Sequence, residues 1–166
     1  MPYIADRLKV QLEEGLAELV NDLNKSRDLE RSLREVITGL ILRYVDRAAW
    51  AKGRSGVALV LDGLGDDDVE GALNYVITNL LMRTICVELR YIYINRAIAV
   101  LELVILRLSG IHIADLGAHH RARTRQGRAL ATLRCVAFEF YRRIGGPYED
   151  TAIDRNGDID CYAIYF

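Results

Sequence analysis

Apolar residues recur every three or four positions along most of the chain, which is the spacing of one face of an α-helix. The first run predicts a helix over about 6–25, with apolar positions Leu8, Leu12, Leu16, Leu19 and Leu23. After a polar turn, a second run predicts a helix from residue 29 to about 51, with apolar positions Leu29, Leu33, Ile37, Leu40 and Tyr44. Gly53 and Gly56 follow this run and favour its end.

The segment 56–65 is too short for periodicity to distinguish a strand from a helix. A short β element near 57–62 therefore stays open, as does one at the C-terminus over 161–166. Asp67 and Glu70 then have the spacing of a capping box, which predicts a helix over 66–84. The acidic block at its start favours helix initiation over a cation site, because it suits the positive end of a helix dipole; its members are Asp62, Asp66, Asp67, Asp68 and Glu70.

The second half of the chain predicts two further helices. Residues 85–94 are rich in β-branched and aromatic side chains, so we expect a break or kink near Arg90. The helix that follows, about 93–109, is apolar on nearly all sides and should lie in the middle of a bundle. We expect 111–126 to be a polar, basic loop, and 127–144 to be the last helix, ended by Gly145-Gly146-Pro147. The predicted fold is mainly α: one domain over 1–166 built as a bundle of about five helices.

An internal repeat relates these last two helices. Residues 95–104 match residues 127–136 at a constant offset of 32, which indicates a duplicated helix packed as an antiparallel hairpin. Glu102 in the first copy corresponds to Arg134 in the second. Because an unpaired buried carboxylate is costly, we expect Glu102 to pair with an arginine, Arg134 first. Asn95 lies on the same face, so this polar strip either fixes helix register or faces a ligand.

Composition and charge exclude some classes of function. The net charge of −1 gives no general attraction to nucleic acid or to anionic membranes, and three charges within Tyr91–Leu108 argue against a membrane span. The cysteines, Cys86, Cys135 and Cys161, are far apart and odd in number, which favours a reduced, cytoplasmic protein. The charged N-terminus predicts no signal peptide.

Several segments, in order, resemble a family of small phage-associated and bacterial proteins of uncharacterised function. They are 1–4 (MPYI), 73–78 (LNYVIT), 94–102 (INRAIAVLE), 139–143 (EFYRR), 147–150 (PYED) and 156–158 (NGD). In that family the third and fourth segments lie on one continuous helix, whereas here an extra stretch equal to the repeat offset separates them. The family glycine within AIGVLE is Ala99 here and Ala131 in the second copy. The resemblance implies a phage or mobile-element context and no particular activity.

The C-terminal region carries the strongest candidate site. Glu139, Arg142 and Arg143 share one side of the last helix, next to Tyr141, and paired arginine donors suit phosphate or carboxylate. One interpretation is an anion or nucleotide pocket closed by Tyr148 and the tail. The other is a structural lock in which the arginines pair with Glu149 and Asp150.

Other chemistry receives less support. Asp154, Asn156, Asp158 and Asp160 alternate as in a calcium loop, but the glycine and the final glutamate that such a loop needs are missing. A zinc site from His112, Asp115 and His119 would need a helical loop. Arg121, Arg123, Arg125 and Arg128 lack interleaved aromatic residues, so nucleic-acid binding is not favoured. A magnesium-dependent, all-α nucleotide pyrophosphohydrolase needs two facing carboxylate pairs, and only one acidic face is found, at Glu13, Glu14, Glu18 and Asp22.

We therefore predict a non-enzymatic, phage-type accessory protein that self-associates and binds a partner protein or a small anionic ligand, with a nucleotide as one candidate. The alternatives are the pyrophosphohydrolase and a purely structural bundle subunit. No catalytic residue, metal site or cofactor is predicted. The candidate ligand-binding residues are Asn74, Tyr75, Asn95, Glu102, Arg134, Glu139, Tyr141, Arg142, Arg143, Tyr148, Glu149 and Asp150.

Overall fold

A computed structural model describes residues 4–45, 56–86, 91–110 and 120–156, and in these ranges every regular element is helical. The elements are α1 (Asp6–Asn24), α2 (Leu29–Val45), α3 (Gly56–Asp62), α4 (Asp66–Thr84), α5 (Tyr91–Ser109), α6 (His120–Phe140), the π-helical turn η2 (Tyr141–Gly145) and α7 (Gly146–Asn156). The prediction of a mainly α-helical bundle is confirmed. Because α6, η2 and α7 run on without a break, the described part has six helical segments rather than about five.

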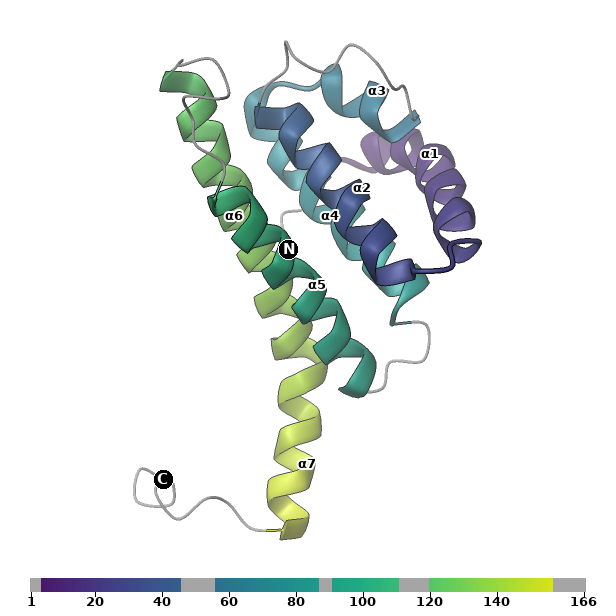
Figure 1. The fold of residues 1–166 in the computed structure, drawn as a ribbon, viewed down its shortest axis with the longest axis vertical. Helices are drawn as coiled ribbons and strands as arrows, with labels where there is room; N and C mark the ends of the chain where they lie inside the picture. The colour runs from purple at the N-terminus through teal and green to yellow at the C-terminus, as the bar shows by residue number, and fades with distance from the viewer. Residues whose placement is uncertain (1–3, 46–55, 87–90, 111–119, 157–166) are drawn as a thin grey trace.

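The bundle has two parts (Figure 1). Helices α1 to α4 pack together, and α5 and α6 form an antiparallel pair that lies against α2 and α4. Helix α7 continues the line of α6 past the end of α5 and leaves the body of the molecule. The two faces predicted for the first helices are confirmed, since Leu12, Leu16, Leu33 and Ile37 are fully buried. Helix α2 is described to Val45, and the predicted remainder to residue 51 lies outside the described residues.

Residues 57–62 form a helix, so the alternative of a β element there is wrong. Helix α3 packs on α1 at a contact between Gly15 and Gly56, where a Cβ on Gly15 would lie 2.5 Å from the backbone nitrogen of Val57. This close approach of two backbones decides the conformation of a segment whose own pattern is ambiguous. The second suggested β element, at 161–166, lies outside the described residues.

Helix α4 begins without the predicted capping box. Its N-cap is Gly65, so Asp67 lies inside the helix and does not occupy the N-cap position. The side chain of Glu70 instead reaches two other helices: it forms an ion pair with Arg128 of α6 and accepts a hydrogen bond of 3.2 Å from the hydroxyl of Tyr44 of α2. Glu70, which the local pattern assigns to the helix terminus, is therefore used in contacts between helices.

Helix α5 lies at the surface, so the prediction that it runs through the middle of the bundle is wrong. Ile94, Leu101 and Leu108 face the core, but Leu103 and Leu106 are exposed. An apolar residue on the outer side of a helix raises the helix's mean hydropathy as much as one in the core, and composition alone cannot distinguish the two. The predicted packing of the two repeat-related helices is observed, and Leu101 and Leu133 are buried at equivalent positions.

The last helix is longer at both ends than the sequence predicts. Helix α6 begins at His120, and Gln126, predicted in a loop, is buried and donates through Nε2 to the carbonyl oxygen of Leu108 at 2.7 Å. At the other end the chain stays helical through Gly145, Gly146 and Pro147.

The turn η2 explains why these three residues do not end the helix. The N–H of Gly146 donates to the carbonyl of Tyr141, five residues back, so the turn is one residue wider than an α-turn. Pro147, which has no N–H to donate, follows directly in the first turn of α7. A Cβ on Gly145 would lie 3.0 Å from the ring of Tyr141, so this glycine makes room for an aromatic side chain.

Candidate functional site

The largest exposed apolar side chains cluster along the C-terminal half of the molecule. Val10 and Leu59 are exposed elsewhere, but the others come from α5 to α7: Ile92, Leu103, Leu106, Phe138, Tyr141, Tyr148 and Ile153. Three of them line a groove of about 510 Å³ between α5 and the α6–η2 segment. We call it the α5–α6 groove; its walls are Ile98, Glu102, Ile105, Leu106, Arg134, Ala137, Phe138 and Tyr141. The most exposed of these apolar residues is Phe138, at 72%.

Glu102 and Arg134 both lie in this groove, but the predicted ion pair between them is not formed. Both side chains are exposed, and neither makes an ion pair with a described residue. The expectation of a buried pair is therefore wrong, because it relied on burial of α5 on all sides. Asn95, on the same side of α5, is also exposed and lies outside the groove lining. Its neighbour Arg96 pairs with Glu30 of α2 through Nε at 2.7 Å.

Glu139 holds the two arginines that follow it. Its carboxylate accepts hydrogen bonds from Nη2 of Arg142 at 3.0 Å and from Nε of Arg143 at 2.7 Å. These contacts, first with Arg142 and then with Arg143, lower the pKa of Glu139 from 4.5 to about 2. The structural interpretation that paired these arginines with Glu149 and Asp150 is thus wrong in its partners. Arginine has five N–H donors, so most donors of both side chains are unused by this contact.

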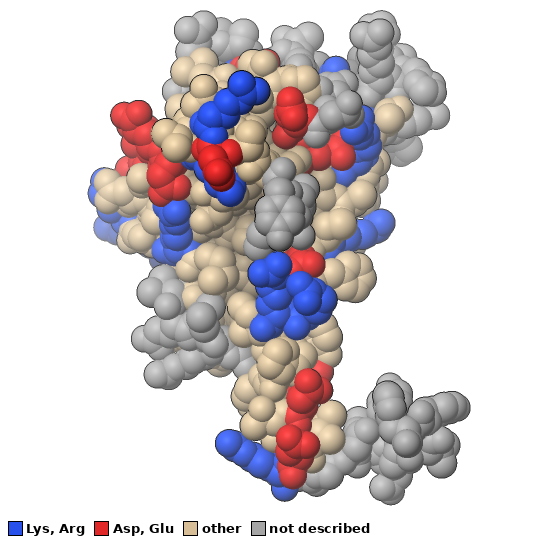
Figure 2. Space-filling model, turned by 180° about the vertical axis from the view of Figure 1, so that it is seen from behind, with Lys and Arg blue, Asp and Glu red and all other residues tan. Residues whose placement is uncertain are grey.

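Helix α7, which carries Tyr148, Glu149 and Asp150, is an arm with little support from the rest of the chain. It packs on η2, and the hydroxyl of Tyr141 hydrogen-bonds the carboxylate of Glu149. Figure 2 shows a compact group of basic side chains at the root of this arm and acidic side chains farther along it. Asp150 and Asp154 are exposed and make no ion pair with any residue that the structure describes.

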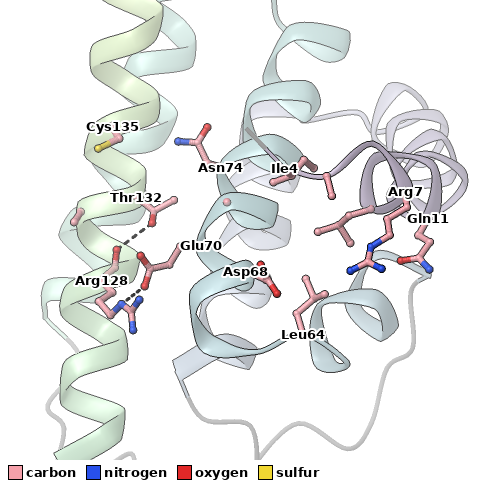
Figure 3. Close-up of a pocket in the computed structure, with 14 residues that line it drawn as sticks. Ile4, Arg7, Gln11, Leu64, Asp68, Glu70, Asn74, Arg128, Thr132 and Cys135 are labelled. Carbon is pink, nitrogen blue, oxygen red and sulfur yellow. Dashed lines mark hydrogen bonds and ion pairs between the residues drawn. The ribbon is translucent and has the colours of Figure 1, made fainter. Parts of the chain in front are cut away.

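A second hollow, more polar than the groove, lies on the opposite side of α6 (Figure 3). We call it the polar cleft: it measures about 600 Å³ and lies between the start of α1, the first half of α4 and the middle of α6. Its lining consists of Ile4, Ala5, Arg7, Leu8, Gln11, Leu64, Asp68, Glu70, Gly71, Asn74, Arg128, Ala131, Thr132 and Cys135. Asn74 is the only residue of this lining that the sequence predicted to bind a ligand. Asp68 and Glu70 were assigned to helix initiation and Arg128 to a basic stretch, whereas Arg7 and Gln11 sit in ordinary helix turns.

The predicted ligand-binding residues thus do not form one site. Asn74 lines the polar cleft, whereas its neighbour Tyr75 is half-buried against the core and accepts a hydrogen bond from Asn79 at its carbonyl. Glu102, Arg134 and Tyr141 share the α5–α6 groove. Glu139, Arg142 and Arg143 form a separate basic cluster below it, and residues 148–150 belong to the arm.

The acidic face proposed for magnesium is divided by its contacts. Glu13 is held by Arg83 of α4, with oxygen–nitrogen distances of 2.5 and 3.1 Å, and Asp22 pairs with Lys25 at 3.3 Å. In the acidic block, Asp62 pairs with Arg43 of α2. Across the described ranges, no three His, Cys, Asp or Glu side chains gather as metal ligands would. The histidines 112 and 119, and Asp158 and Asp160, fall outside those ranges.

Comparison with known proteins adds no identification. No family model matches the chain, and neither a curated protein nor a solved structure matches it significantly. None of the described helices has both the length and the apolar character that crossing a membrane requires. The fold and its surfaces define a class, an all-α bundle with an exposed apolar groove and a projecting helical arm, and function has to be argued from those surfaces.

Proposed function

We propose that this chain is a non-enzymatic, phage-type accessory protein that works as a homo-oligomer, in which α7 of one copy lies in the α5–α6 groove of another. One observation carries the proposal: α7 exposes Tyr148, Ile153 and two carboxylates that pair with no described residue, and its main contact within the described ranges is the turn from which it starts. Exposed apolar side chains of this size mark surfaces that another molecule covers, so the eleven-residue arm calls for a surface to hold it.

The groove supplies an apolar surface of suitable dimensions. Leu106, Phe138 and Tyr141 are all exposed within it, and burying such side chains is the main favourable term in association. At 1.5 Å per residue, an eleven-residue arm is about 16 Å long, and the groove wall from Ile98 to Leu106 is about 12 Å long. Most of the arm can therefore lie along the groove.

The charges of the two surfaces are complementary. The arm carries Asp150, Asp154 and Arg155, and the groove carries Arg134 and Glu102. No described residue forms an ion pair with any of these five side chains. With the arm in the groove, its carboxylates would form ion pairs with Arg134, and Arg155 would form one with Glu102. A reciprocal exchange of arms gives a closed dimer with two-fold symmetry, the commonest form of homo-oligomer.

Light scattering of the full chain tests the proposal. We expect a mass of at least twice the 18.8 kDa of one chain, and a monomer for Phe138→Glu. Val10→Glu is the matched control, because Val10 is 74% exposed on α1, far from the groove, and Phe138 is 72% exposed. A monomeric parent protein, or an oligomer that persists in Phe138→Glu and Leu106→Glu, would refute self-association through this groove.

Mixing two variants distinguishes arm exchange from simple groove-to-groove contact. Phe138→Glu damages only the groove, and the double variant Tyr148→Glu/Ile153→Glu damages only the arm. An equimolar mixture of the two monomeric variants retains one intact arm–groove contact, so association should partly return. In a groove-to-groove dimer, the arm variant would stay oligomeric by itself.

A second candidate function is supported by the basic cluster. Glu139 orients Arg142 and Arg143 while most of their N–H donors stay unused, which suits a phosphate or carboxylate group of a small ligand. Calorimetry against a nucleotide panel should then give binding that disappears in Arg142→Ala/Arg143→Ala. Absence of heat with every nucleotide would remove this candidate without affecting the arm proposal.

The magnesium-dependent hydrolase is the least supported alternative, because its first acidic face is already divided between Arg83 and Lys25. Turnover of nucleoside triphosphates with magnesium, lost in Glu14→Gln/Glu18→Gln, would reverse this ranking.

A further inference from the structure

The polar cleft contains a buried side chain whose hydrogen-bonding capacity is only half used. Asn74 is 5% exposed, and its carbonyl oxygen accepts a hydrogen bond from the hydroxyl of Thr78 at 3.4 Å. Its amide nitrogen points into the cleft (Figure 3) and donates to no described residue. This nitrogen is open to solvent through the cleft, because it is not one of the fully buried polar atoms that lack a partner, so it can donate to an acceptor that enters the cleft.

Two opposite charges face the same space. Arg7 extends from α1 and Asp68 from α4, on opposite sides of the cleft (Figure 3), and neither makes an ion pair with a residue that the structure describes. The other two charges of the lining, Glu70 and Arg128, already pair with each other. The cleft therefore offers one positive and one negative group, on separate walls, and has no net charge of its own.

We propose that the polar cleft binds a small zwitterion, with an ammonium and a carboxylate group, of the size of a dipeptide or tripeptide. The carboxylate lies toward Arg7, the ammonium lies toward Asp68, and the amide of Asn74, which points toward α6, donates to a carbonyl oxygen of the peptide. A simple anion fits less well, because Asp68 and Glu70 would repel it. Ile4, Leu8 and Leu64 supply the apolar part of the lining for a side chain. The cleft volume of about 600 Å³ lies in the range of small-molecule sites.

Calorimetry with dileucine, alanyl-leucine and trileucine tests the proposal, with the same peptides acetylated at the amino end or amidated at the carboxyl end as controls. We expect the free peptides to bind and each capped form to bind at least about tenfold more weakly, because each loses one charged hydrogen bond. Capped forms that bind as well as the free peptides, or no binding by any peptide, would overturn the proposal.

Substitutions test which residue binds each end of the peptide. Arg7→Gln should weaken binding of free peptides at least about tenfold while leaving the amidated forms unchanged. Asp68→Asn should weaken binding of free peptides by a similar factor while leaving binding of the acetylated peptides unchanged. Both residues are exposed, so the fold should tolerate these changes. Asn74→Asp keeps the shape but removes the N–H donors; it should weaken the binding of every peptide, free or capped, with a thermal melt as the check on folding.

The alkylation rate of Cys135 measures peptide binding without calorimetry. Its exposed thiol lines the cleft, so bound trileucine should slow its alkylation by iodoacetamide in a Cys161→Ser background. Cys86 is the internal reference, because burial raises the pKa of its thiol to about 11 and keeps it unreactive. Equal alkylation rates with and without saturating peptide would place the peptide elsewhere. Because the cleft and the α5–α6 groove share no residue, neither result depends on the oligomeric state.

Discussion

Gly15 shows how a single position determines packing between elements. It lies in the interior of α1, where glycine is unfavourable by about 0.5–1 kcal/mol relative to alanine. A Cβ here would approach the backbone of Gly56 and Val57 to within 2.8 and 2.5 Å. Backbone atoms cannot move aside as a flexible side chain can, so α1 and α3 would have to separate.

We therefore expect Gly15→Ala to destabilise the protein by about 1–3 kcal/mol or more, measured by urea unfolding. Gly39→Ala is the matched control, because Gly39 is also inside a helix but a Cβ there meets nothing within 4 Å. That variant should be stabilised by about 0.4–1 kcal/mol. Equal effects of the two substitutions would contradict the close approach of α1 and α3.

The cluster of Glu139, Arg142 and Arg143 predicts a pH dependence. Its arginines lower the pKa of Glu139 to about 2, below the ordinary value of 4.5, so the carboxylate form is favoured in the folded protein. This contribution to stability is fully present above about pH 4.5 and is lost as the pH falls toward 2. A carbon NMR titration should place the Glu139 midpoint near 2, and Arg142→Gln/Arg143→Gln should raise it toward 4.5. A midpoint that does not move in that variant would mean that other groups depress the pKa.

Helix α7 differs from the other helices in what stabilises it. The first five helices bury apolar residues against one another, whereas the main contact of α7 among the described elements is with η2. If an oligomer protects the arm, its amide hydrogens should exchange slowly in the parent protein and much faster in monomeric Phe138→Glu. Exchange in α4, whose Leu73, Ile77 and Leu80 are fully buried, should be the same in both. Fast exchange of α7 in the parent protein would indicate that nothing covers the arm.

Helices with a one-sided apolar pattern could be predicted well from the sequence, and their ends could not. The pattern of α1 and α2 places Leu12, Leu16 and Ile37 in the core, as observed. The end of the last helix was wrongly predicted because Gly145-Gly146-Pro147 usually stops a helix. Here, the wide turn η2 accommodates all three residues. The start of α6 was missed because the polar and basic residues before Gly127 have no apolar face of their own.

Within α5, two nearby leucines should differ in how much they contribute to the free energy of unfolding. Leu101 is fully buried between helices, and Leu103 is 47% exposed on the side of α5 that faces α2, outside the α5–α6 groove. Leu101→Ala should lower the free energy of unfolding by about 2–5 kcal/mol. Leu103→Ala should change it by less than about 0.5 kcal/mol in a monomeric Phe138→Glu background. Chemical denaturation in that background measures both, and similar losses would place Leu103 in the core.

The candidate sites depend on how distant segments meet. Glu70 and Arg128 are far apart in the sequence, yet they form one wall of the polar cleft. Arg7 and Asp68 meet there only because α1 and α4 pack side by side. The local patterns assign Asp68 and Glu70 to a helix start and Arg128 to a basic stretch, and none of them indicates that these charges line one cleft, so sequence reasoning placed only Asn74 in a binding site.

Local periodicity alone determined that the chain is a helical bundle and which residues form most of its core. The spacing of apolar side chains is a property of each segment and does not depend on its neighbours. Only the tertiary structure decided that α5 lies at the surface, that Glu102 and Arg134 stay apart, and that α7 projects as an arm. Exposure and pairing are properties of which helices lie against each other, and no single segment contains that information.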